Sequence, residues 1–202
     1  ENGGYIVNRT EKSKVEAVVD AAIANGIYVI IDWHSHHAED YSDEAVEFFS
    51  EMAKKYGAFP NIIYEIYNEP LDISWKNTIK PYAEKVITAI RLEDPDNLIL
   101  VGTPKWCQNV DDVIGNEIEG INIAYTFHFY ASENSHHQTL FTKATNAINA
   151  GIPLFVTEWG VSEASGDGAF NKTWTQEWLQ FMDDNKLSWC NWSVADKAET
   201  SA

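Results

Sequence analysis

The chain alternates short, continuously apolar segments with longer segments whose apolar residues recur every three or four positions. Residues 27–31 are the clearest short segment. Their mostly β-branched residues, without polar alternation, are typical of a parallel strand buried on both faces. In the segment before them, apolar residues stand at positions 15, 18, 19, 22 and 23, the spacing of an amphipathic helix. We expect this helix to begin after Thr10 and to end at Gly26.

The same pattern recurs along the whole chain, with a spacing of about 30 residues. The expected strands are 27–31, 62–67, 98–101, 121–129, 154–157 and 187–192, and the expected helices lie around 15–23, 46–56, 81–92, 110–116, 137–150 and 170–185. Strands that alternate with helices indicate right-handed crossovers and a parallel sheet. No linker, low-complexity tract or change in composition divides the repeats, so we expect residues 1–202 to form part of one catalytic domain.

Polar and aromatic residues that could bind or react follow nearly every expected strand. They are His34, Asn68, Glu69, Thr103, Trp106, His128, Tyr130, Glu158 and Trp192. An open doubly wound sheet would concentrate such residues at one switch point. A (β/α)8 TIM barrel brings the end of every strand to one mouth, which fits this distribution better.

The sequence therefore predicts a TIM barrel, although six strand-helix units cannot close one. We expect that the first two strands precede Glu1, that the last helix lies beyond this chain, and that these residues are a piece of a longer catalytic domain. An intact mass of the natural protein near 22.8 kDa would contradict this expectation.

The composition limits the kinds of molecule that this chain could bind. Hydrophobic residues make up 45% of the chain, which excludes a disordered protein. Thirty-one acidic residues against 14 basic ones give a net charge of −17, which argues against nucleic acid and anionic membranes as partners. A neutral polysaccharide is not repelled by such a charge. Cys107 and Cys190 lack metal-ligand spacing, and we expect two unpaired thiols.

Two carboxylates stand directly after apolar runs. Glu69 follows the expected strand 62–67, and Pro70 holds it in extended backbone. Glu158 follows the expected strand 154–157. Each alone could be a solvated loop residue. Two such residues on separate barrel strands predict a pair of carboxylates that face each other across a cleft, the apparatus for cleavage of a glycosidic bond.

Five segments, in chain order, resemble those of a known family. Residues 66–70 read Ile-Tyr-Asn-Glu-Pro, residues 128–130 read His-Phe-Tyr, and residues 156–160 read Val-Thr-Glu-Trp-Gly. With Asp-Trp-His at 32–34 and Trp-Ser-Val-Ala-Asp-Lys at 192–197, they resemble glycoside hydrolase family 5, in its bacterial endo-β-1,4-glucanase branch. The resemblance runs through essentially the whole chain.

This resemblance implies an endo-acting, secreted hydrolase of β-1,4-glucan polysaccharide that uses neither metal nor organic cofactor. Glu69 would be the general acid/base and Glu158 the nucleophile of a retaining mechanism. Retention requires carboxyl groups about 5–5.5 Å apart, whereas inversion requires about 6.5–9.5 Å. We expect the charge of the ionised nucleophile to favour protonation of Glu69 near neutral pH.

The resemblance also implies roles for the neighbouring residues. Asn68 would hydrogen-bond the 2-hydroxyl of the sugar that is cleaved, and His34 would contact the same sugar. Tyr130 would donate to the nucleophile, and His128 would lie beside the acid/base. A hydrogen-bonded structural histidine is the alternative for both histidines.

Aromatic platforms and polar contacts complete the expected site. Trp192, with a cis peptide after it, would form the floor of the central subsite, and Trp106 would stack on the leaving-group side. Lys197 and Glu199 would bind the non-reducing side, with a solvated tail as the alternative. The family also carries an arginine on an early strand that precedes this chain, and Arg9 is no substitute for it.

Three alternatives stay open at this point. A related β-glycanase would act on mannan, xylan or mixed-linkage glucan. An inactive barrel fragment would bind carbohydrate without cleaving it. A metal-dependent amidohydrolase would use His34, His36, His128 and Asp196 as ligands, whereas we expect His136 and His137 to be a solvated pair.

Overall fold

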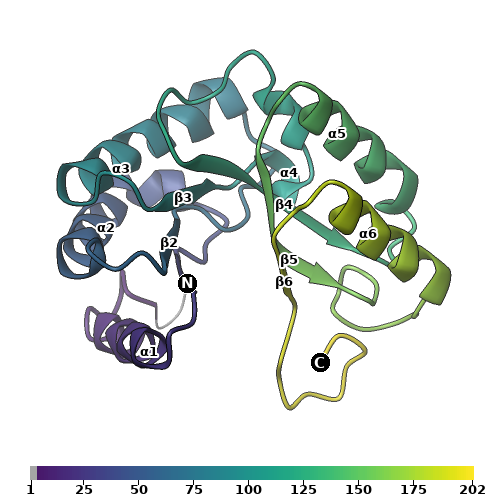
Figure 1. The fold of residues 1–202 in the computed structure, drawn as a ribbon, viewed down its shortest axis with the longest axis horizontal. Helices are drawn as coiled ribbons and strands as arrows, with labels where there is room; N and C mark the ends of the chain where they lie inside the picture. Colours follow the sequence, from purple (N-terminus) through teal and green to yellow (C-terminus); the bar gives the residue numbers. More distant parts are fainter. Residues whose placement is uncertain (1–3) are drawn as a thin grey trace.

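The computed structural model describes residues 4–202, so the Glu1-Asn2-Gly3 start of the chain lies outside it. Six parallel strands pair in chain order in one sheet. They are β1 (Val29–Asp32), β2 (Ile62–Glu65), β3 (Leu98–Val101), β4 (Ile123–Tyr130), β5 (Leu154–Gly160) and β6 (Trp189–Asn191). The strands curve into an open arc with the helices outside it (Figure 1). This arrangement confirms the predicted portion of a (β/α)8 barrel.

Five long helices cover the outside of the arc. They are α1 (Glu11–Asn25), α2 (Ser42–Tyr56), α3 (Lys80–Glu93), α5 (His137–Asn149) and α6 (Lys172–Asp184). Shorter turns are η1 (Ala38–Tyr41), the π-helical η2 (Trp75–Ile79), α4 (Pro104–Cys107) and the 3-10 turn η3 (Val110–Val113). Among the helices of residues 4–202, none has the length and apolar character that crossing a bilayer requires.

The prediction of a helix around 110–116 was wrong. Only the short turn η3 forms there, because Asp111 and Asp112 have low helix propensity and Gly115 takes a left-handed φ of 73°. The end of α1 was predicted correctly, since Gly26 is left-handed and its N–H donates to the carbonyls of Ala22 and Ile23. At its start, however, Thr10 is already helical and makes no side-chain cap.

The apolar core lies on both sides of the sheet. Between the sheet and the outer helices, Trp178 of α6 is completely buried and stacks on Phe129 of β4 and Phe141 of α5, at ring-centroid distances of 3.9 and 3.8 Å. On the concave side, Ile63, Leu100, Ala124 and their neighbours form a smaller cluster. That second cluster is the apolar floor of the barrel interior.

One extra residue in β5 changes which side chains face inward. Thr126 pairs with Phe155, but the next inward position of β4, His128, pairs with Glu158, so β5 is one residue longer between these pairs. Phe155 belongs to the inner cluster, whereas Val156 and Trp159 belong to the outer core. Residues 157 and 158 therefore both face the barrel interior, which a regular strand would not allow.

We predict that Trp178→Ala lowers the free energy of unfolding by about 3–5 kcal/mol, because it removes the ring at the centre of the outer core. Trp178→Phe is the matched control. It keeps an aromatic ring and removes an indole N–H that is buried without a partner, so its loss should be less than half as large. Urea denaturation measures both changes, and equal losses would contradict this account of the core.

Candidate active site

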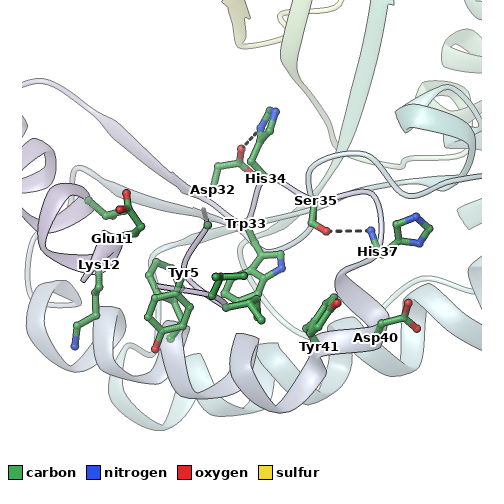
Figure 2. Close-up of a pocket in the computed structure, with 15 residues that line it drawn as sticks. Tyr5, Glu11, Lys12, Asp32, Trp33, His34, Ser35, His37, Asp40 and Tyr41 are labelled. Carbon is green, nitrogen blue, oxygen red and sulfur yellow. Dashed lines mark hydrogen bonds and ion pairs between the residues drawn. The ribbon is translucent and has the colours of Figure 1, made fainter. Parts of the chain in front are cut away.

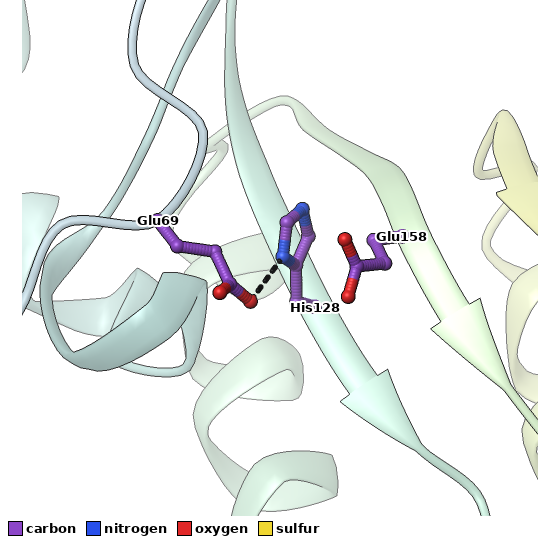
Figure 3. A group of neighbouring side chains, drawn as sticks. All are labelled: Glu69, His128 and Glu158. Carbon is purple, nitrogen blue, oxygen red and sulfur yellow. Dashed lines mark hydrogen bonds and ion pairs between the residues drawn. The ribbon is translucent and has the colours of Figure 1, made fainter. Parts of the chain in front are cut away.

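The structure brings the two predicted carboxylates together above the polar side chains of the barrel interior. Glu69 lies just beyond β2, and Glu158 lies within β5, one residue after the bulge. One carboxylate oxygen of each residue lies within 4.8 Å of the other and of a ring nitrogen of His128. Figure 3 shows His128 of β4 between the two side chains. Both carboxylates are only partly exposed, so a reacting group could reach them.

His128 and His36 surround the carboxylate of Glu69. His128 Nδ1 lies 3.0 Å from Glu69 Oε1, and His36 Nδ1 lies 3.7 Å from Glu69 Oε2. Burial alone would raise the pKa of Glu69, but the hydrogen bond with His128, followed by the positive charge that His128, His36 and His34 carry when protonated, lowers it overall. The expectation of a pKa shifted toward protonation was therefore wrong for this structure, because the histidines outweigh the effect of burial.

Tyr130 holds Glu158 in place from the end of β4. Its hydroxyl donates to Glu158 Oε1 at 2.8 Å. Burial, followed by the charge of Glu158, raises the pKa of Tyr130, so the phenol keeps its proton and remains a donor. The backbone N–H of Tyr130 donates to Nδ1 of His136 at 3.0 Å. The prediction that His136 and His137 are solvated was wrong, since both are buried.

His137 is buried because it packs against α6. Its ring stacks on Trp174 at a centroid distance of 4.5 Å, and its Nε2 lies 2.6 Å from Glu177 Oε2. These contacts fix the start of α5 against α6. His137 therefore has a structural role, whereas His136 contacts the end of β4, at Tyr130.

At the mouth, His34 beyond β1 faces Trp192 beyond β6. The two rings are nearly parallel, with centroids 6.0 Å apart. Asp32 Oδ2 accepts from His34 Nδ1 at 2.7 Å, and this hydrogen bond raises the pKa of His34. The peptide bond between Trp192 and Ser193 is cis, as the family resemblance implies. These rings mark one wall of the opening above the carboxylate pair.

Trp106 is held on an unusual turn on the other side of Glu69. Lys105, Trp106 and Cys107 have consecutive left-handed φ angles of 59°, 54° and 58°, each of which is costly for a residue other than glycine. The Trp106 N–H donates to the carbonyl of Pro70 at 2.8 Å, and Cys107 Sγ–H donates to the carbonyl of Asn68 at 2.9 Å. The turn is thus tied to the segment that carries the acid/base candidate.

The remaining predicted residues differ in their placement. Asn68 is buried beside Glu69, with its N–H bonded to the carbonyl of Trp33. Lys197 and Glu199 form an ion pair with each other at 3.3 Å in the C-terminal segment. Cys107 and Cys190 are free thiols, as predicted.

Two polar residues of the barrel interior escaped the sequence analysis. Glu65 ends β2 and is only 4% exposed, and its Oε1 accepts from the Thr157 hydroxyl at 2.6 Å. The Thr157 oxygen lies 2.8 Å from His128 Nε2. One signal was available in the sequence, because Glu65 is a charged residue inside an otherwise apolar strand.

Of the residues that the structure describes, only Glu69, His128 and Glu158 place three potential metal ligands within 4.8 Å. Both ring nitrogens of His128 already have protein partners, Glu69 and Thr157, so a metal would have to displace one of them. The set His34, His36, His128 and Asp196 is not gathered in one place. The amidohydrolase ligand layout is therefore wrong.

A pocket that is not lined by Glu69, His128 or Glu158 lies beside β1. It has a volume of about 660 Å³ and lies between the first turn of the chain, α1, the end of β1 and η1, with Tyr5, Trp33 and His34 among its lining residues (Figure 2). Within residues 4–202, no strand pairs with this side of β1, and Tyr28 is 74% exposed. The pocket lies at that unpaired edge of the sheet.

Comparisons with known proteins point to one family. The profile of the family described as cellulase (glycosyl hydrolase family 5) matches residues 1–198. Endoglucanase Z of Dickeya dadantii is 59% identical over 200 residues, which cover 98% of this chain and 46% of that protein. Endoglucanase A of Evansella cellulosilytica is 48% identical over 206 residues, covering 100% of this chain and 42% of that protein. This chain thus spans less than half the length of these two relatives.

Solved structures give the same result. One from Cytophaga hutchinsonii superposes with a TM-score of 0.96 at 55% identity and covers 100% of this chain and 66% of that chain. A variant of the catalytic domain of a Thermobifida fusca endoglucanase, in complex with cellotetraose, superposes with a TM-score of 0.93 at 34% identity and covers 100% and 68%.

The His34–Asp32 contact generates a pH prediction. Because the pKa of His34 is raised above its ordinary value of 6.5, the pair stabilises the fold fully below that value. The contribution is lost as the pH rises through the higher pKa of the folded state. We expect Asp32→Asn to lower the pKa of His34 in an NMR titration, whereas Asp40→Asn on η1 should leave it in place. Equal pKa values in wild type and Asp32→Asn would refute this cause.

Proposed function

Since the chain belongs to glycoside hydrolase family 5, we propose that it forms part of the catalytic domain of an endo-acting β-1,4-glucan hydrolase that retains anomeric configuration. The observation that carries this proposal is the Glu69–Glu158 pair, whose carboxylate oxygens approach within 4.8 Å. That separation fits a retaining pair, at about 5–5.5 Å, and leaves too little room for the water that an inverting enzyme needs.

In the first step, Glu158 attacks the anomeric carbon and Glu69 gives its proton to the departing glycosidic oxygen. The hydrogen bond from Tyr130 to Glu158 Oε1 orients the carboxylate, so that its other oxygen is available to attack. The bond from the anomeric carbon to the leaving oxygen breaks as the bond to Glu158 forms. The product is a glycosyl-enzyme ester and a shortened glucan chain.

In the second step, Glu69 acts as the base. Its carboxylate takes a proton from water, the water oxygen attacks the anomeric carbon, and Glu158 leaves. Two inversions give net retention. His128, bonded to Glu69 Oε1, favours the carboxylate form that this step requires. The proposed cycle uses only side-chain carboxylates and therefore calls for no metal or organic cofactor.

A glucan chain would lie across the mouth. Trp192 and His34 would contact the sugar at the centre, and Trp106, which is 39% exposed, would stack on the leaving-group side. Asn68 would bond the 2-hydroxyl, and Lys197 with Glu199 would contact the non-reducing side. A neutral polymer suits a chain with a net charge of −17. Because such a polymer is too large to enter a cell, we propose that the enzyme is secreted.

We predict that Glu158→Gln lowers the rate of new reducing ends from carboxymethylcellulose by at least about a thousandfold, because the amide cannot form the ester. Glu163→Gln, an exposed position on the loop after β5, is the matched control and should keep the wild-type rate. The assay uses the natural protein that carries these residues. A Glu158→Gln variant with a tenth of the wild-type rate would refute the nucleophile assignment.

The same protein should release products whose new reducing end is in the β configuration before mutarotation, since a retained β linkage gives a β product. Proton NMR of cellotetraose hydrolysis in its first minutes measures this. Release of the α anomer would contradict double displacement. Parallel assays with mannan, xylan and mixed-linkage glucan identify the preferred polymer, and glucan binding without hydrolysis in the wild type would support the inactive carbohydrate-binding alternative.

A further inference from the structure

Glu65 is a buried carboxyl group that the proposed mechanism leaves unused. It ends β2, faces Asp32 of β1 in register, and is 4% exposed. No Lys, Arg or His among residues 4–202 forms an ion pair with it. Within the described residues, the partners of its Oε1 are both hydroxyls, those of Thr157 at 2.6 Å and Thr126 at 3.3 Å. A charge in such a place is costly unless it is paired, so this carboxyl group is better accommodated as the neutral acid.

Hydrogen bonds connect Glu65 to the acid/base candidate. The Thr157 oxygen lies 2.8 Å from His128 Nε2, and His128 Nδ1 lies 3.0 Å from Glu69 Oε1. These hydrogen bonds form a line that starts at Glu65 on β2, passes through β5 and β4, and ends at Glu69 beyond β2. It depends on the bulge, because only the extra residue in β5 turns Thr157 and Glu158 inward together.

The protons along this line can be placed in two arrangements. When Glu65 carries the proton, it donates to Thr157, Thr157 donates to His128 Nε2, and His128 Nδ1–H donates to the Glu69 carboxylate. When Glu65 is ionised, Thr157 donates to it, neutral His128 donates from Nε2 to Thr157, and its Nδ1 accepts from protonated Glu69. Both arrangements hold the same number of protons and the same heavy-atom positions.

We infer that Glu65 stores the proton of the acid/base and delivers it to Glu69 through Thr157 and His128, an inference that rests on the proposed function. The Glu65 proton passes to Thr157 Oγ1, the Thr157 proton passes to His128 Nε2, and the His128 Nδ1 proton passes to Glu69 Oε1. The net result moves one proton to Glu69 and one negative charge to Glu65. Glu65 is thus a positioning residue, since it acts on Glu69 only through the two others.

The resting charges are consistent with storage at Glu65. Burial, then the charge of Asp32, raises the pKa of Glu65, whereas the pKa of Glu69 is lowered overall despite its burial. A glucan chain over Glu69 would remove water from its carboxylate and draw the proton toward it. The titratable groups that face or adjoin Glu65 are Asp32, Glu69, Cys107, His128, Glu158 and Cys190.

Glu65→Gln tests the inference, because the amide preserves shape and hydrogen bonding but cannot release a proton. For cellotetraose, the basic limb of the kcat/KM profile should move down by about one pH unit, with about a tenfold loss above that limb. For 2,4-dinitrophenyl β-cellobioside, whose leaving group departs without a proton, kcat/KM should stay within about twofold. Equal losses on both substrates, or an unchanged profile, would overturn the inference.

Variants of Thr157 distinguish proton transfer along the hydrogen-bonded line from a general effect on packing. Thr157→Val keeps both carboxyl groups but breaks the line, and it should reproduce the profile of Glu65→Gln. Thr157→Ser keeps the hydroxyl and should restore the wild-type profile. Thr126→Val removes the other donor to Glu65 without touching the line, so its basic limb should not move down. A downward shift in Thr126→Val as large as that in Thr157→Val would overturn the inference.

A measurement without turnover completes the test. In the free protein at neutral pH, the infrared spectrum should show a protonated carboxyl carbonyl band that Glu65→Gln removes, and its absence would overturn storage at Glu65. If the wild type is active but Glu65→Gln does not lose more activity on cellotetraose than on the dinitrophenyl substrate, the inference is overturned and the proposed function stands. A wild type without hydrolysis overturns the proposed function, and the inference with it.

Discussion

The parallel pairing of β4 with β5, interrupted by one extra residue in β5, is the constraint on which the site depends. Pairing sets His128 opposite Glu158, so the histidine lies between the two carboxylates. The bulge lets Thr157 and Glu158 face the same side, although neighbours on a regular strand face opposite sides. The aromatic stack around Trp178 supports this pair of strands from behind, because Phe129 of β4 is part of it.

The barrel interior is arranged in three levels from floor to mouth. Apolar side chains from β2, β3 and β4 form the lowest level. Above them, Glu65, Thr126 and Thr157 satisfy one another by hydrogen bonds. The carboxylate pair and His128 form the upper level, where partial exposure gives a substrate access. The middle level explains how a carboxyl group can be buried under a reactive site, since hydroxyl donors replace the water that it loses.

The order of elements and the carboxylate pair could be predicted from the sequence, because apolar periodicity and strand-end residues are local signals. The rest depends on tertiary contacts. The bulge in β5 leaves no pattern in the residues 154–160, and the left-handed turn at Trp106 contains no glycine that would indicate it. His136 looked like a polar helix start, yet the N–H of Tyr130 gives it a buried partner. The direction of the pKa shift of Glu69 depends on His128 of β4 and on histidines just after β1. Only folding brings these residues close to Glu69.

The turn at Lys105, Trp106 and Cys107 has an evolutionary consequence. The indole cannot move independently, because the same three residues hydrogen-bond to the carbonyls on either side of Glu69, the proposed proton donor. A lineage that shifted this tryptophan to widen or narrow the proposed glucan site would also disturb Glu69. Under the proposed function, changes in sugar preference should therefore accumulate on the opposite, C-terminal rim, where side chains can change without that coupling.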